Sequence, residues 1–130
     1  MNEFRVWDNV RKEWIKNVDI IMDSTGKIFA GDLSNPPMVK IEPEFVFFST
    51  GLLDKKGNIV YDNSLIIWEI DNGVGIEQYS AHIVWSERTE LFKGEFRWLV
   101  KYEEGKYDDL SHVCQYMDSI QVVGSVQEDL

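Results

Sequence analysis

The sequence predicts a mainly β fold (β-rich α+β), either an antiparallel sheet or a small, partly open SH3-like barrel, with one short C-terminal helix. Three observations indicate this class. Short apolar segments recur about every ten residues. Turn signals separate them, most clearly at residues 23–26, 54–57 and 71–73. The helical spacing of apolar residues occurs once near the end of the chain, so a sheet with a single helix is expected.

Length and composition favour one packed domain covering residues 1–130. The chain is 44% hydrophobic and contains five tryptophans, which argues against disorder. The single cysteine, Cys114, excludes an internal disulfide and fits a reducing compartment. Its longest apolar runs fall far below the roughly 18 residues of a membrane span. We therefore expect a soluble protein in the host cytoplasm, with no membrane association.

Two segments of the N-terminal third are harder to assign. Residues 14–22 carry apolar residues at helical spacing but are rich in β-branched residues, and we assign them to a strand. Residues 33–44 contain all three prolines and are expected to form a surface connection. This connection suggests an N-terminal hairpin unit, 1–44, packed on a main sheet, 45–130.

The strands of the main sheet follow from the apolar pattern. Segments 45–48, 65–70 and 81–85 are apolar without alternation, as in strands covered on both faces. Segment 92–102 alternates and is expected to be one long strand. Its expected core side chains are Phe92, Phe96, Trp98, Val100 and Tyr102, and its expected solvent side chains are Lys93, Glu95, Arg97 and Lys101.

The predicted helix lies just before the last strand. Leu110, Val113, Cys114 and Met117 recur at i, i+3, i+4 and i+7, and either Asp108 or Asp109 is suited to cap the N-terminus. The helix should lay this stripe on the sheet and lead into a strand at 120–126.

Three spaced motifs resemble those of one family. Residues 4–8 read FRVWD, residues 50–61 read TGLLDKKGNIVY, and residues 122–124 read VVG. Their order and spacing resemble the YopX-like proteins of phages and prophages, a family without an assigned molecular function. The resemblance implies that these motif residues build the fold. We predict that the motif glycines adopt left-handed backbone angles, that Asp54 accepts a hydrogen bond within its turn, and that the motif aromatics contribute buried area to the core. The framework residues are Phe4, Trp7, Asp8, Thr50, Gly51, Asp54, Gly57, Tyr61 and Gly124.

The chain departs from this family pattern in two places. Asp62, Asn63 and Ser64 stand where the family usually has Glu, Gly and Asp. Asn63 is the residue there most able to adopt the left-handed backbone of a glycine. After Gly124 the chain also lacks the asparagine, tyrosine and Asn-Pro of the family ending.

The net charge of −10 disfavours binding to phosphate backbones. Such acidity commonly keeps a protein soluble. The more specific alternative is that the acidic surface imitates nucleic acid and blocks a basic surface of another protein. One basic feature stands out: Lys93, Arg97 and Lys101 share the solvent face expected for strand 92–102. This face is a candidate contact for nucleic acid or an acidic partner, and cross-strand salt bridges are the simpler explanation.

The sequence predicts no catalytic, metal-binding or cofactor-binding residue. Asp108, Asp109, His112 and Cys114 come closest to metal-ligand spacing, but a helix cap, a surface histidine and a buried thiol explain them better. The second histidine, His82, falls in a strand segment, and nucleotide-binding and nucleophile motifs are missing from the sequence.

Together these observations favour a non-catalytic phage or prophage accessory protein that acts as a protein-interaction or oligomeric module. Aromatic segment 45–48 would be an aggregation hazard at a sheet edge, and self-association would cover it. We therefore expect a homo-oligomer, with a host or phage protein as a further partner. The alternatives are a nucleic-acid-binding small β-barrel and a small enzyme with carboxylate acid/base chemistry.

Overall fold

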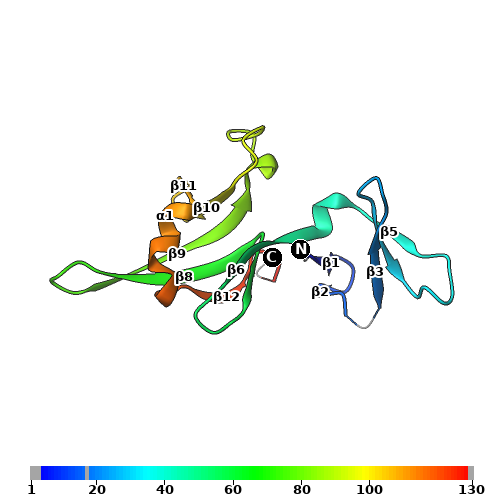
Figure 1. Cartoon of the computed structure of the whole chain (residues 1–130), viewed down its shortest axis with the longest axis horizontal. Helices are drawn as coiled ribbons and strands as arrows, with labels where there is room; N and C mark the ends of the chain where they lie inside the picture. Colours follow the sequence, from blue (N-terminus) through cyan, green and yellow to red (C-terminus); the bar gives the residue numbers. More distant parts are fainter. Residues whose placement is uncertain (1–3, 17, 129–130) are drawn as a thin grey trace. The chain divides into compact units, whose positions relative to one another are not determined.

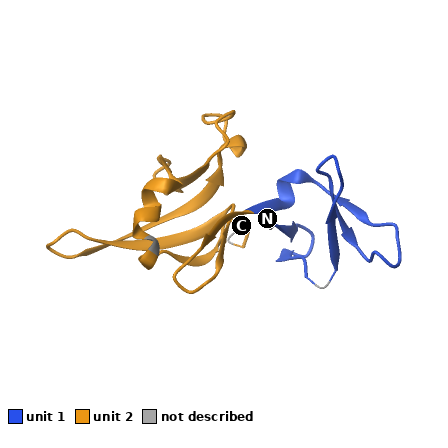
Figure 2. Cartoon of the chain, in the orientation of Figure 1, with its two compact units in different colours: residues 1–48 blue, residues 49–130 orange. Residues whose placement is uncertain are grey.

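The chain divides into two compact units, residues 1–48 and residues 49–130 (Figure 2). The computed structural model describes residues 4–16 and 18–128, except the side chain of Met117. The division falls after residue 48, and not after residue 44 as the prolines suggested. Strand β6 (Val46–Leu53) explains the difference, because its first residues pair with β1 (Phe4–Asp8) inside the first unit.

Unit 1 is built from short antiparallel strands (Figure 1). Strand β1 pairs with β2 (Glu13–Trp14) and with the start of β6, while β4 (Ile28–Gly31) lies between β3 (Asp19–Met22) and β5 (Val39–Ile41). A 3₁₀ turn, η1 (Pro43–Phe45), precedes β6. Val6, Ile28 and Val46 form the small core. Trp14 packs edge-on against Trp7 and Phe47, at centroid distances of 4.9 and 5.7 Å.

Two predictions for this unit need correction. Segment 14–22 is not one strand, because β2 ends at Trp14 and β3 begins at Asp19; residue 17 lies outside the described residues. Segment 33–44 is not all connection, because Val39 to Ile41 pair with β4. These three residues follow the Pro36-Pro37 pair, so the prolines leave their backbone donors free to join an edge strand.

Unit 2 confirms the predicted class: it contains a five-stranded antiparallel sheet that curls around one short helix (Figure 1). The strand order is β11-β10-β9-β8-β12. The strands are β8 (Ser64–Asp71), β9 (Ile76–Trp85), β10 (Trp98–Tyr102), β11 (Tyr107–Asp109) and β12 (Gln121–Ser125). The end of β6 pairs with β7 (Ile59–Tyr61).

The core of unit 2 lies between the sheet and the helical segment. The helix α1 (Leu110–Val113) is followed by a 3₁₀ segment, η3 (Cys114–Ser119), whose backbone leaves helical geometry at Tyr116. Leu110 and Val113 are buried as the helical spacing predicted, and they pack in one cluster with sheet residues such as Trp68. Asp109 is the N-cap, since its Oδ1 accepts a hydrogen bond from Ser111 N at 2.9 Å.

The predicted strands 65–70 and 81–85 are confirmed as parts of β8 and β9, and the last strand as β12. The prediction for 92–102 is wrong in its first half, because β10 begins only at Trp98. Gly94 and Phe96 have φ angles of 92° and 48°, which lie outside the extended backbone of a regular strand. Phe96 is 70% exposed, so it lies outside the core that alternation assigned to it.

Candidate interaction surfaces

The segment that replaces the expected strand is an ordered loop, residues 86–97, which follows β9 and begins with the 3₁₀ turn η2 (Ser86–Arg88). Its two ends are joined, because Ser86 N donates to Arg97 O at 3.0 Å and Arg97 N donates to Ser86 Oγ at 2.9 Å. Inside the loop, Phe92 N donates to Thr89 Oγ1 and Gly94 N donates to Glu87 Oε1. These bonds give the loop a defined shape without burying its tip.

Two apolar side chains of this loop face solvent. Leu91 is 74% exposed and Phe96 is 70% exposed. Phe96 also holds the left-handed backbone, which is unfavourable for an aromatic residue without a local polar side chain. An exposed aromatic residue kept in a strained conformation marks the loop as a candidate contact surface.

We predict that Phe96→Gly raises the free energy of unfolding by about 1 kcal/mol, because glycine adopts φ near 48° without the Cβ penalty. Chemical denaturation followed by circular dichroism would measure the change. Leu91→Gly is the matched control: Leu91 is equally exposed but has no positive φ, so its replacement should give no gain. An equal effect of both substitutions would contradict the strain at Phe96.

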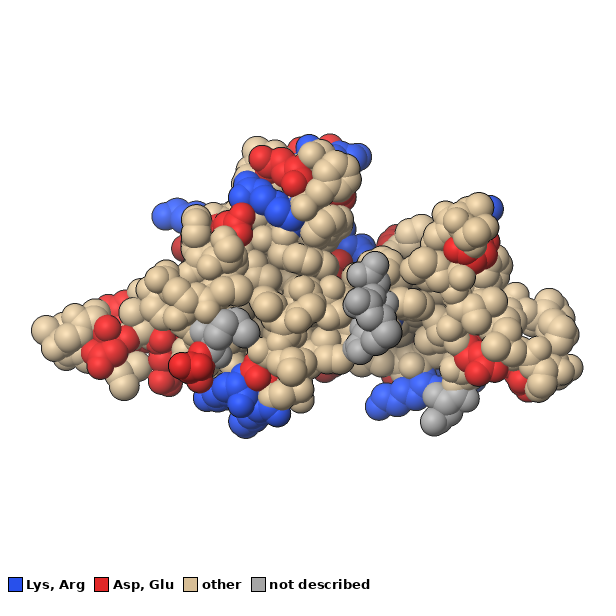
Figure 3. Space-filling model, in the orientation of Figure 1, with Lys and Arg blue, Asp and Glu red and all other residues tan. Residues whose placement is uncertain are grey.

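The distal part of the β8–β9 hairpin, residues 69–79, extends beyond the rest of the sheet; we call it the arm (Figure 1). At its tip Val74 is 95% exposed and Ile76 is 67% exposed. Asn72 shapes the turn, since its Oδ1 accepts from Val74 N and Gly75 N at 3.1 Å each. Carboxylates lie behind the apolar tip (Figure 3). The predicted hairpin turn at 71–73 is confirmed.

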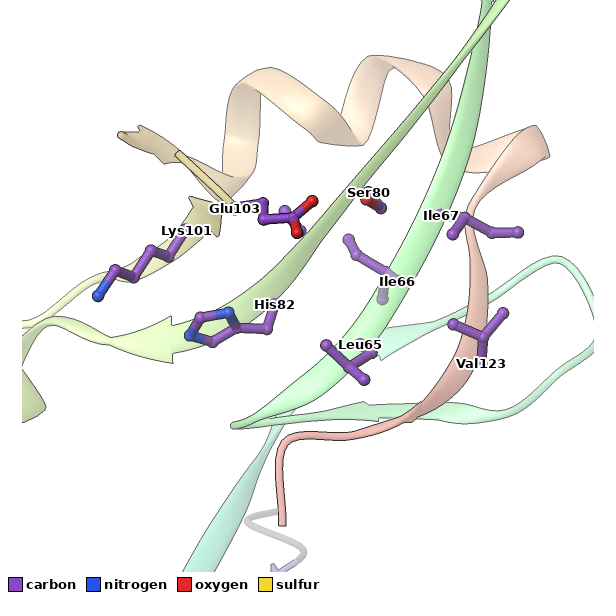
Figure 4. A pocket seen from close by; sticks show the side chains of 9 residues that line it. Leu65, Ile66, Ile67, Ser80, His82, Lys101, Glu103 and Val123 are labelled. Carbon is purple, nitrogen blue, oxygen red and sulfur yellow. The ribbon is translucent and has the colours of Figure 1, made fainter. Parts of the chain in front are cut away.

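The outer face of the five-stranded sheet carries a shallow hollow of about 330 Å³ (Figure 4). Leu65, Ile67 and Val123 give it an apolar surface, and His82 and Lys101 stand on neighbouring strands at its side. Burial and the neighbouring Lys101 cation lower the pKa of His82, so the imidazole is neutral at pH 7. This arrangement suits contact with an apolar surface better than proton transfer.

Unit 1 has a groove of about 470 Å³ between the β1–β2 hairpin and strands β4 and β5. Buried Trp7 and Ala30 form part of its lining. Val10, Val18 and Val39, also on the lining, are 92%, 48% and 68% exposed. The groove therefore presents uncovered aliphatic side chains at its edges.

The predicted basic face on 92–102 does not form along one strand. Lys93 lies in the 86–97 loop, whereas Lys101 lies in β10 with its ammonium 5.4 Å from the centre of the Tyr107 ring. Arg97 is held by two carboxylates, Asp109 at 2.7 Å and Glu95 at 3.2 Å. Its charge is therefore largely compensated, as the simpler salt-bridge explanation anticipated.

The residues nearest to metal-ligand spacing have other partners. His112 Nδ1 lies 2.7 Å from Asp108 Oδ1. The Asp109 carboxylate accepts hydrogen bonds from Ser111 and from the Arg97 guanidinium. These hydrogen bonds lower the pKa of Asp109 to about 2, although burial opposes them. Cys114 packs against the core of unit 2, where burial raises the pKa of its thiol. Within residues 4–16 and 18–128, three or more His, Cys, Asp or Glu side chains do not gather into a metal-ligand cluster.

Comparison with known proteins places the chain in a family. Residues 3–129 match the YopX protein family. The chain belongs to the YopX family. In its fold it is similar to a solved structure, the crystal structure of protein EF1440 from Enterococcus faecalis, with a TM-score of 0.55 and 19% sequence identity. The similarity covers 99% of this chain and 95% of that one. The comparison with curated proteins gave no match.

In this YopX-family chain the predicted turn hydrogen bond of Asp54 is confirmed, and the same carboxylate also bonds to a distant strand. Its Oδ1 accepts from Lys56 N at 2.9 Å and Asn58 N at 2.8 Å within the turn. Its Oδ2 accepts from Val122 N of β12 at 2.9 Å. Burial opposes ionisation, but the backbone donors of Val122 and Asn58 outweigh it and lower the pKa of Asp54.

The predicted left-handed angles of the YopX turn motif are confirmed. Gly51 and Gly57 have φ of 84° and 83°. Asn63 has φ of 65°, so it takes the angle that the family's usual glycine would supply. Its backbone joins two elements, since Asn63 N donates to Ile83 O and Asn63 O accepts from Val126 N.

The other framework residues lie in or beside strands. Phe4 packs on the unit 1 core, and Trp7 is 4% exposed. Asp8 Oδ1 accepts from Val10 N and Arg11 N in the turn after β1. Thr50 Oγ1 donates to Val60 O at 2.8 Å across the β6–β7 hairpin. Tyr61 ends β7, half-buried, and Gly124 lies at the irregularity in the β8–β12 pairing.

Sequence reasoning missed the buried ion pair between Asp62 and Arg88. Asp62 is 2% exposed, accepts a hydrogen bond from Arg88 Nε through Oδ2, and accepts another from Trp85 N at 3.3 Å. Burial raises the pKa of Asp62, and the charge and hydrogen bond of Arg88 act against that rise. The pair fixes the start of the 86–97 loop to the β7–β8 turn. No local pattern could have indicated it, because its partners are 26 residues apart.

None of the helices in the described part of the chain is long and apolar enough to cross a membrane.

Proposed function

We propose that this YopX-family chain is a non-catalytic, phage-type protein-interaction module that works as a homo-oligomer in the host cytoplasm. The observation that carries the proposal is the uncovered apolar tip of the arm, where Val74 is 95% and Ile76 is 67% exposed on a shaped turn. Uncovered aliphatic side chains at the end of a projecting hairpin lose favourable burial unless another protein surface covers them.

The polar groups support a structural role over catalysis. Asp54 is occupied by backbone donors, Asp62 by Arg88, and Asp109 by its helix cap and Arg97. Each of these carboxylates holds two parts of unit 2 together. The half-buried single thiol, Cys114, agrees with a reducing compartment.

Light scattering coupled to size-exclusion chromatography tests the oligomer. We expect a mass that is a multiple of one chain, and an oligomer that weakens on dilution over about a hundredfold concentration range. A single-chain mass at every concentration would contradict the proposal.

Capture of the tagged protein from phage-producing host cells, with and without nuclease, tests the partner class. A protein partner that survives nuclease supports the interaction module. Partners lost with nuclease, together with a salt-dependent mobility shift of DNA, would instead favour the nucleic-acid alternative.

A further inference from the structure

We propose that the arm of one copy docks its apolar tip into the unit 1 groove of a second copy. This inference rests on the proposed homo-oligomer and names the two surfaces that would form it. The arm and the groove are different surfaces of one chain, so their contact is head-to-tail and repeats from copy to copy. A ring results if the rotation between copies closes.

The arm is shaped before binding, which reduces the entropy lost on docking. Asn72 Oδ1 fixes the turn, and its Nδ2 donates to Glu77 Oε1 at 2.9 Å. Tyr79 Oη donates to Glu77 Oε2 at 2.6 Å, and the Tyr79 ring stacks on buried Trp68 with centroids 5.8 Å apart. A continuous set of contacts therefore runs from the core of unit 2 to the turn that presents Val74.

The groove offers the matching apolar surface. Trp7 and Ala30 are buried parts of its lining, and Val39 and Val10 stand largely uncovered at its edges. A volume of about 470 Å³ lies within the usual range of binding pockets, roughly 300–1,000 Å³, and suits the tip of a hairpin. Docking Val74 and Ile76 there would cover aliphatic side chains on both copies.

Net charge favours unit 1 over unit 2 as the surface that receives the arm. Between residues 69 and 79 the arm carries Glu69, Asp71 and Glu77 and no lysine or arginine. Most of the acidic excess of the chain lies in residues 49–130, so unit 2 of a second copy would repel the arm. Unit 1 is close to balanced and places cations in the groove.

The groove is lined by three cations, Arg11, Lys16 and Lys40, and by three carboxylates, Asp8, Glu13 and Glu42. Asp8 is already used, because it accepts two backbone N–H groups and lies 3.9 Å from Arg11. Lys16 and Lys40 make no ion pair with any other residue that the structure describes. Both ammonium groups are available to the carboxylates of an incoming arm.

The first test is the double variant Val74→Asp/Ile76→Asp in the full chain, measured by light scattering. We expect it to remain folded, because both side chains are exposed, and to elute with the mass of a single chain. Leu91→Asp is the matched control, since Leu91 is 74% exposed but lies on the 86–97 loop. It should assemble as the wild type does, and thermal melting confirms that all three proteins are folded.

The second test shows that the contact joins two copies. Glu69→Lys and Lys40→Glu should each weaken assembly about threefold or more, because each replaces an exposed charge and places like charges at the contact. An equimolar mixture of the two variants should regain assembly, since the reversed arm meets the reversed groove and the native arm meets the native groove. Recovery on mixing cannot come from a contact within one chain.

The outcomes separate this inference from the proposed function. A wild type that is always a single chain overturns both. If the wild type and the Val74→Asp/Ile76→Asp variant assemble equally, the oligomer stands and the arm contact is wrong. If Leu91→Asp alone abolishes assembly, or the mixture stays dissociated, the arm-to-groove pairing is also overturned.

Discussion

Asp54→Ala is expected to lower the free energy of unfolding by about 2–4 kcal/mol, because the substitution leaves three backbone donors around the buried Asp54 side chain without an acceptor. The Oδ1 acceptor of Lys56 N and Asn58 N is lost inside the turn, and the Oδ2 acceptor of Val122 N is lost between the turn and β12. Urea denaturation followed by circular dichroism measures the change.

Asp23 provides the matched control, because it has the same turn chemistry without the distant partner. Its Oδ1 accepts from Thr25 N at 2.9 Å and Lys27 N at 3.0 Å, and the residue is exposed. Asp23→Ala should therefore lower the free energy of unfolding much less than Asp54→Ala. Equal losses for the two variants would show that the bond to Val122 contributes nothing.

The lowered pKa of Asp54 predicts that its contribution to the free energy of unfolding depends on pH. Its pKa is lowered in the folded chain from the ordinary value of 3.8, so its contribution to stability is complete above that value. The contribution is lost as the pH falls through the folded-state pKa. The difference in unfolding free energy between wild type and Asp54→Ala should accordingly narrow in acid, and a constant difference would contradict the ionised hydrogen-bonded carboxylate.

Arg88→Met is expected to destabilise the chain by about 3–5 kcal/mol at pH 7, because it leaves the buried Asp62 carboxylate without its cation. Asp62 is 2% exposed, whereas the Arg88 side chain is 30% exposed and can be replaced without filling the core. The double variant Asp62→Asn/Arg88→Met should recover part of the loss, since the uncompensated charge is gone. Chemical denaturation of the three proteins measures both effects.

The pKa of Asp62 is shifted in the opposite direction to that of Asp54, although both variant deficits are expected to shrink in acid. Burial raises the pKa of Asp62 above its ordinary value, so its folded-state contribution is greatest at low pH and is lost as the pH rises through the folded-state pKa. Without Arg88 the pKa of Asp62 should rise further. The deficit of Arg88→Met relative to wild type should therefore shrink as the pH is lowered, and a deficit that stays constant would contradict an ionised Asp62.

If the ion pair holds the start of the 86–97 loop, Arg88→Met should also loosen the surface that carries Leu91 and Phe96. The loop keeps its second attachment, because Arg97 remains bonded to Asp109 at 2.7 Å. The ion pair between Asp62 and Arg88 therefore affects both the stability of the folded chain and the position of the exposed loop side chains.

The sequence by itself determined the features that depend on neighbouring residues. Alternation and turn signals indicated antiparallel strands, and helical spacing placed the buried Leu110 and Val113. The left-handed backbone of Gly57 and of Asn63 was predictable, because the steric limits on φ belong to the residue itself. The turn bond of Asp54 was predictable for the same reason, since its acceptor and donors are close in the chain.

Only the tertiary structure decided which distant groups meet. Alternation could not show that residues 92–97 leave the strand. Their path is set by hydrogen bonds to residues outside the segment, from Arg97 N to Ser86 Oγ and from the Arg97 side chain to Asp109. Asp54 reaches Val122 across 68 residues, and Asp62 meets Arg88 across 26. Such pairs exist because the folded sheet brings separate turns together and excludes water from them, so their partners and energies are properties of the fold and not of any local pattern.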